Sequence, residues 1–169
     1  MSVHVLVRDE VQFGFGLDAE VNAHLQRAAS LVTSRAESLQ ALLAAKQASP
    51  EQLEVLVALY KFYFYQSDLE KAEQTVQQAL ACAARQGGFA VHWQELAEDA
   101  SDWSDPRGPG RAYLYALKAL AFIRLRQDRP AEARQVLDAL QHLDPDDRVG
   151  ADVIRDLQNG LQQEDEDGY

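Results

Sequence analysis

The chain has 169 residues, of which 47% are hydrophobic, and this is enough for a folded domain with a core of its own. Its 27 acidic and 16 basic residues give a net charge of −11, which argues against nucleic acid or an anionic membrane as the main partner. A single cysteine excludes an intrachain disulfide, and no apolar stretch approaches the roughly 20 residues of a membrane-spanning helix. Because the N-terminus also lacks a signal-peptide pattern, we expect a cytoplasmic protein.

The N-terminal part is predicted to be an extension, residues 1–17, followed by helical spacing over residues 18–48. In the extension Val3, Val5 and Val7 alternate as in an extended segment. Asp18 can cap a first helix, and Thr33–Ser34 offers a turn to a second. Because nothing at this turn forbids an unbroken helix, the pattern is compatible with one helix or two.

The central stretch, Leu53 to Ala84, predicts a pair of amphipathic helices. Ser49 is the expected cap of the first helix, with Pro50 at its first helical position. Ser67 and Glu70 have the spacing of a capping box, which predicts that a second helix begins there. Two such helices joined by a tight turn form a helical hairpin.

The helical pattern breaks at residues 87–110, which we interpret as an insertion rich in Gly, Ser, Asp and Pro. It carries both tryptophans of the chain. We expect Trp93 to pack over the gap that the insertion leaves in the helical superhelix, and Trp103 to be exposed as a candidate contact for a partner.

A third helical pair is predicted from Arg111, followed by a last helix that covers the end of the fold. In this last helix Val149, Val153, Leu157 and Leu161 share one stripe, which we expect to be buried. Residues 163–169 are acidic and predicted to form a disordered tail, which can compete with an acidic ligand for basic residues.

The helical pairs recur at regular offsets. Leu25 lies 34 residues before Leu59, and Ala133 lies 61 residues after Ala72, so about 27 residues are extra relative to the first period. In the central pair the pattern resembles the tetratricopeptide repeat (TPR) family, and the matching residues are Leu59, Tyr63, Ala72, Val76 and Ala79.

This resemblance implies an all-α, TPR-like helical-hairpin solenoid with about three degenerate repeats plus a C-terminal capping helix, forming one helical domain over residues 18–162. YKFYFY at residues 60–65 and DPDDRVGADV at residues 144–153 also resemble small TPR proteins associated with bacterial nitrogen-fixation genes.

The TPR resemblance further implies a concave groove lined by the first helix of each pair. Cations in this groove would hold carboxylates, and aromatic rings would hold apolar side chains. The residues carried over as partner-binding are Arg27, Lys61, Phe64, Tyr65, Tyr115, Lys118, Phe122 and Arg126.

The sequence shows no pattern typical of catalysis. The four histidines are scattered, and no His, Cys and Asp cluster has the spacing of metal ligands. We therefore expect a non-enzymatic protein without a cofactor or bound metal.

Three functions remain open. The first is a protein–protein interaction module, an adaptor or assembly factor that holds an acidic or amphipathic segment of another protein. The alternatives are a cytoplasmic secretion-type TPR chaperone and a helper in the assembly of a nitrogenase-type metalloenzyme. We expect a monomer or a weak homodimer.

Overall fold

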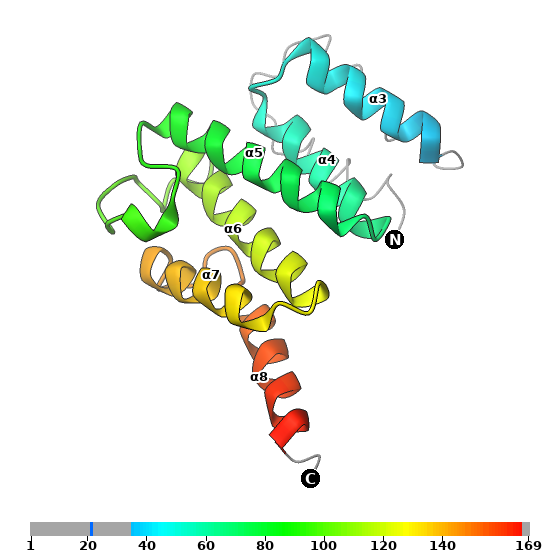
Figure 1. Ribbon diagram of the computed structural model, residues 1–169. Coiled ribbons are helices and arrows are strands. Elements are labelled where there is room, and N and C mark those ends of the chain that lie inside the picture. The colour runs from blue at the N-terminus through cyan, green and yellow to red at the C-terminus, as the bar shows by residue number, and fades with distance from the viewer. Residues whose placement is uncertain (1–20, 22–34, 167–169) are drawn as a thin grey trace. The chain divides into compact units, whose positions relative to one another are not determined.

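The computed structural model describes Val21 and residues 35–166, and everything said below of the structure concerns these residues (Figure 1). The predicted extension, the first helix of the first pair and the question of one helix or two over residues 18–48 lie outside them. The described part is entirely helical and holds no strand, which confirms the all-α class. Its elements are α3 (Arg35–Ala48), α4 (Leu53–Tyr65), α5 (Leu69–Gly87), the short 3-10 helix η1 (Trp93–Glu95), α6 (Pro109–Arg126), α7 (Pro130–Leu143) and α8 (Asp152–Glu166).

The chain divides into two compact units, residues 1–82 and 83–169, and the boundary falls within α5. In the first unit α3 packs against α4, and both contribute alanine and larger apolar side chains to one buried cluster. Small residues let the two helices approach closely, while the bulky ones fill the space between them. The cluster consists of Val21, Ala41, Leu42, Ala45, Val55, Ala58, Leu59 and Phe62.

The turn between α4 and α5 is a Schellman motif with a non-glycine residue in the left-handed conformation. Ser67 has φ = 60°, its N–H donates to Phe64 O at 3.0 Å, and Asp68 N–H donates to Tyr63 O at 2.9 Å. Asp68 then caps α5, because its Oδ1 accepts from Lys71 N–H at 3.3 Å. The predicted capping box of Ser67 and Glu70 is therefore wrong, since Ser67 terminates the preceding helix instead.

The predicted start of α4 is also displaced. Ser49 and Pro50 form a turn, in which Gln52 N–H donates to Ser49 O at 3.2 Å, and the helix begins only at Leu53.

The second unit contains a hairpin with the same turn. α6 and α7 pack side by side (Figure 1), and Asp128 between them has φ = 58°. Asp128 N–H donates to Leu125 O at 3.1 Å, and Arg129 N–H donates to Arg124 O at 2.9 Å. Asp128 lies 61 residues after Ser67, which is the offset that the sequence indicates for Ala72 and Ala133.

Buried positions follow the same offset. Three residues of the first hairpin and their counterparts 61 residues later are each at most 1% exposed. The pairs are Leu59 and Leu120, Ala72 and Ala133, and Val76 and Leu137.

The insertion folds into a compact loop around an aromatic cluster at the start of α6. The rings of Phe89 and Tyr113 each lie beside the Trp103 ring, with centroids 5.2 and 6.2 Å from it. Trp103 Nε1 donates to Glu98 O at 2.8 Å, and Tyr113 OH donates to Val91 O at 2.5 Å. Trp103 is only 5% exposed, so the prediction that it is an exposed partner contact is wrong.

Trp93 lies in η1 and is half-buried, and the guanidinium carbon of Arg124 lies 5.5 Å from its ring centroid. This contact places Trp93 against α6, and its predicted packing over the gap in the superhelix stays a prediction.

The last helix, α8, docks on the α6–α7 hairpin with a different face from the one predicted. Ile154 and Gln158 are buried, and Gln158 Nε2 donates to Pro130 O at 2.7 Å. Arg155 donates to Gln141 Oε1 at 2.8 Å and to Leu137 O at 2.9 Å. These hydrogen bonds to backbone carbonyls of α7 hold the helix in the place of an apolar contact surface.

The predicted stripe of the last helix is buried only at its start. Val149 is 3% exposed, whereas Val153, Leu157 and Leu161 are 74%, 47% and 48% exposed. The helix also continues to Glu166, so the tail predicted to begin at residue 163 is helical over its first four residues.

Candidate functional site

The predicted partner-binding residues of the first unit lie near the C-terminal end of α4. Lys61 and Phe64 are half-buried, and Tyr65 is 42% exposed. The Phe64 and Tyr65 rings meet edge to face with centroids 5.4 Å apart. This arrangement places a cation and an accessible aromatic surface on one helix. Arg27, which the prediction places beside them, lies outside the described residues.

The predicted residues of the second unit share one face of α6, because their spacing of three and four residues repeats the helical period. Tyr115 is 45% exposed, Phe122 is half-buried and Arg126 is exposed. The two faces belong to different units.

Lys118, on the same face of α6, has an internal role. Its Nζ donates to Val149 O at 2.8 Å and so holds the loop before α8 against α6. The next residue of this loop, Gly150, has φ = 70°, and a Cβ there would lie 3.6 Å from Lys118 Nζ. Glycine at this position gives the loop its left-handed turn, which the carbonyl needs to reach the ammonium group.

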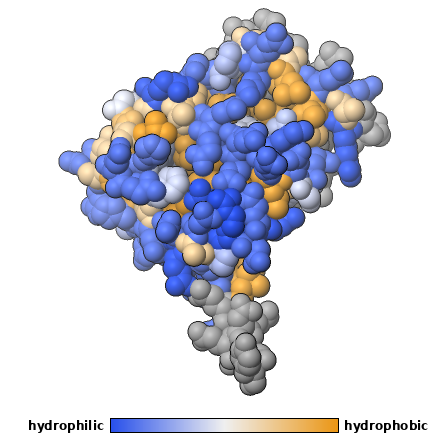
Figure 2. All heavy atoms as spheres, viewed as in Figure 1, coloured by the Kyte–Doolittle hydropathy of each residue, from blue (hydrophilic) through white to orange (hydrophobic). Residues whose placement is uncertain are grey.

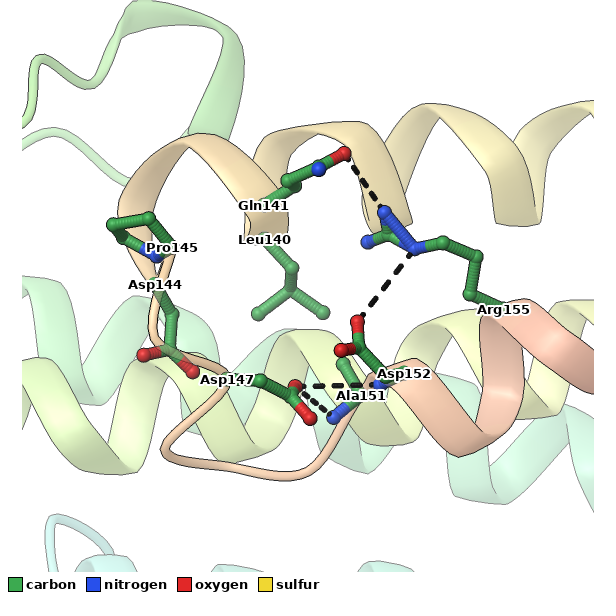
Figure 3. A pocket seen from close by; sticks show the side chains of 8 residues that line it. All are labelled: Leu140, Gln141, Asp144, Pro145, Asp147, Ala151, Asp152 and Arg155. Atoms are coloured by element: carbon green, nitrogen blue, oxygen red, sulfur yellow. Dashed lines mark hydrogen bonds and ion pairs between the residues drawn. The ribbon is translucent and has the colours of Figure 1, made fainter.

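The junction of α7 and α8 encloses a cavity of about 70 Å³ (Figure 3). Asp147 Oδ1 accepts from Ala151 N–H at 2.6 Å and from Asp152 N–H at 3.3 Å, which satisfies backbone groups at the start of α8. Asp152 Oδ1 in turn lies 3.9 Å from Arg155 Nε. This volume has room for about two waters. Since the charged groups that line it interact with one another, the cavity belongs to the packing of the α7–α8 junction.

A buried carboxylate supports the same junction. Asp144 is 4% exposed; its Oδ2 accepts from Val149 N–H at 3.1 Å, and its Oδ1 lies 3.9 Å from Arg148 Nη1. Asp144, Asp147, Arg155 and Gln158 were not singled out from the sequence. For Asp144 and Asp147 the signal is the dense Asp and Pro pattern of a loop, which favours side-chain to backbone hydrogen bonds. Arg155 and Gln158 lie in α8, where no such pattern marks them.

A second, open hollow of about 300 Å³ lies between the insertion and the end of α7. His142 Nδ1 lies 3.4 Å from Glu98 Oε1 across it. On its rim Ser104 Oγ donates to Asp102 Oδ1 at 2.5 Å, and this hydrogen bond lowers the pKa of the Asp102 carboxyl below its usual value. Its lining residues are Glu98, Ser101, Asp102, Trp103, Ser104, His142, Leu143, Pro145 and Arg148.

Within the described ranges no group of three or more His, Cys, Asp or Glu side chains is arranged to hold a metal ion. The same residues include no helix with the length and hydrophobicity that a membrane crossing requires. The one cysteine, Cys82, is buried and its Sγ donates to Glu51 O at 3.2 Å.

No family model matches the chain, and no solved structure resembles it. The chain is 33% identical over 120 residues to an "uncharacterized 19.8 kDa protein in nifW 5′ region" of Azotobacter chroococcum mcd 1. The match covers 70% of this chain and 67% of that protein. The chain therefore belongs to the same family as the nifW-region protein of Azotobacter.

Proposed function

We propose that the protein is a non-enzymatic interaction module that binds a segment of another protein along the first helices of TPR-like hairpins. The observation that carries the proposal is that α4 and α6 each present an exposed tyrosine together with basic residues, Tyr65 with Lys61 and Tyr115 with Arg126. Tyrosine and arginine are among the residue types that contribute most to protein interfaces, and lysine can add charge complementarity.

The repeated turn supports the TPR-like part of the proposal. Ser67 and Asp128 have the same backbone conformation at the same place in two hairpins. Repeats of this kind stack into a solenoid whose corresponding helices line one surface. In that arrangement the groove is lined by Arg27, Lys61, Phe64, Tyr65, Tyr115, Lys118, Phe122 and Arg126.

The chemistry of these residues favours an acidic or amphipathic segment as the ligand. Lys61 and Arg126 can pair with carboxylates, while the rings of Phe64 and Phe122 offer apolar contact. Lys118 is already engaged, because its Nζ donates to Val149 O, and we expect a smaller contribution from it.

A second, more specific candidate follows from the relative. Its gene lies in the 5′ region of nifW, which favours a partner from the nitrogen-fixation apparatus. On this reading the protein is a helper in the assembly of a nitrogenase-type metalloenzyme.

Photo-crosslinking in the native host tests both candidates. A photoreactive phenylalanine analogue replaces Tyr65 in one strain and Tyr115 in another. Leu43 on α3, which is 42% exposed but outside the proposed groove, is the control position. We expect both tyrosine positions to crosslink to one protein that the Leu43 position does not reach.

Charge-reversal variants test the proposed groove, and growth conditions separate the two candidate functions. Lys61→Glu and Arg126→Glu should each weaken the crosslink while circular dichroism shows that the helix content is kept. A partner found only in cells grown without fixed nitrogen supports the nitrogen-fixation reading, and one found in all media contradicts it. Different partners at Tyr65 and Tyr115, or the same one at Leu43, would refute a shared groove.

A further inference from the structure

The exposed side of α8 carries an apolar stripe. Val153, Leu157 and Leu161 are spaced four residues apart and stand 74%, 47% and 48% exposed. Side chains at this spacing lie one above the other along a helix. Gly160 lies next to Leu161, and a Cβ there would meet nothing within 4 Å. A second helix can approach closely at such a glycine.

The stripe is turned outward because other residues anchor the helix. Arg155 and Gln158 hold α8 to α7 through its first two turns. Figure 1 shows α8 running past the end of the α6–α7 hairpin, so its second half projects from this unit. Figure 2 shows a small patch of hydrophobic surface in the place that α8 occupies in Figure 1.

The charges of α8 indicate which charge a partner should carry. The helix contains five acidic residues and one basic residue, Arg155. The Arg155 guanidinium is already engaged by Gln141 and Leu137 O, and its Nε lies 3.9 Å from Asp152 Oδ1. This leaves the exposed Asp156 without a compensating cation on α8. The last turn has no basic residue but carries Glu164, Asp165 and Glu166.

We propose that α8 is a docking surface for an amphipathic helix with a basic rim on another protein. Its apolar side chains cover Val153, Leu157 and Leu161, while its Lys and Arg side chains lie beside Asp156. A second copy of the chain fits poorly, because two α8 helices would bring like charges together along the whole contact. This surface is distinct from the faces of α4 and α6, so the inference goes beyond the proposed groove.

The test uses the full chain and a synthetic probe. The probe is a fluorescent amphipathic peptide of about five helical turns with a leucine stripe between lysines. Its control has every lysine replaced by glutamate. Fluorescence anisotropy should show binding of the lysine peptide and none of the glutamate peptide. Binding should weaken as salt rises, because the charges are exposed.

Variants locate the binding on the stripe. Leu157→Gln with Leu161→Gln should weaken binding of the lysine peptide at least about tenfold, the loss typical of a central interface contact. Leu43→Gln, a matched change of an exposed leucine in the other unit, should leave the affinity unchanged. Circular dichroism checks that the double variant keeps its helix content.

Three results would overturn the proposal. The first is equal affinity of the double variant and the wild-type protein. The second is a dimer in sedimentation experiments that the double variant abolishes, because a second copy then occupies the stripe. The third is tighter peptide binding after deletion of residues 1–16, because the N-terminal segment then covers it.

Discussion

Replacing Trp103 with phenylalanine is expected to destabilise the second unit by about 2–3 kcal/mol. The indole N–H donates to Glu98 O, and losing one such bond costs about 1 kcal/mol. Phenylalanine keeps part of the contact with Phe89 and Tyr113, but it leaves space where the larger indole was packed at 5% exposure. That space and the weakened ring contacts add about 1–2 kcal/mol. Trp103→Ala, which removes the ring entirely, should cost about 3–5 kcal/mol.

Trp93→Phe is the matched control. Trp93 is half-buried, and its main contact is the Arg124 guanidinium over the ring, a contact that phenylalanine partly retains. We expect a loss of less than about 1 kcal/mol. Urea unfolding followed by circular dichroism gives both values, and the two variants are compared at a common temperature.

Fluorescence of the same variants provides an independent check. Trp93→Phe leaves Trp103 as the only emitter, and its emission should be blue-shifted until the protein unfolds. Equal stability losses in the two variants, or a red, water-exposed spectrum from Trp103, would refute the aromatic cluster as the core of the insertion.

The other predictions concern single sites. Burial raises the pKa of Tyr113 above that of an unfolded tyrosine, near 10, so the native state keeps its proton longer. Stability should therefore fall as pH rises above about 10, and Tyr113→Phe should remove this part of the slope in urea titrations at several pH values. Gly110→Ala should lower the melting temperature, because a Cβ would lie 2.8 Å from Ser101 Oγ and 3.2 Å from the Trp103 ring. Gly160→Ala should instead stabilise α8 by up to about 1 kcal/mol, measured by the same melting experiment, since nothing lies near its Cβ. Ala133→Trp should destabilise the α6–α7 hairpin by about 1–3 kcal/mol or prevent folding, and a variant that melts like wild type would contradict the burial of this position.

Hydrophobic periodicity was sufficient to predict most helices and the 61-residue offset. The described positions Leu59, Val76 and Leu137 are buried as their spacing indicates. Helix ends were less predictable, since Ser67 and Asp68 are both good caps. The choice between them depends on the end of α4, which needs Ser67 for its own terminal hydrogen bonds.

The face of α8 could not be predicted from apolar spacing. Arg155 and Gln158 dock the helix by donating to backbone carbonyls of α7, and such bonds leave no hydrophobic pattern. Trp103 was misplaced for a related reason. Its position depends on contacts with Phe89 and Tyr113 across the insertion, which is tertiary information.

Of the proposed groove, the sequence was sufficient to identify exposed aromatic residues on α4 and α6. It could not predict that Lys118 would be engaged by Val149 O, because the two residues are 31 positions apart.

The three-residue turns at residues 66–68 and 127–129 also fix which face the second helix of each hairpin turns toward the first. One inserted residue would turn the second helix by about 100° and swing a small residue such as Ala72 away from its partner helix. A longer connection between hairpins costs little by comparison, because closure entropy grows slowly with length. In an alignment with relatives of different length, insertions and deletions should therefore fall between the hairpins, and both turns should keep three residues. The hairpin is then the module that evolution can copy or exchange whole.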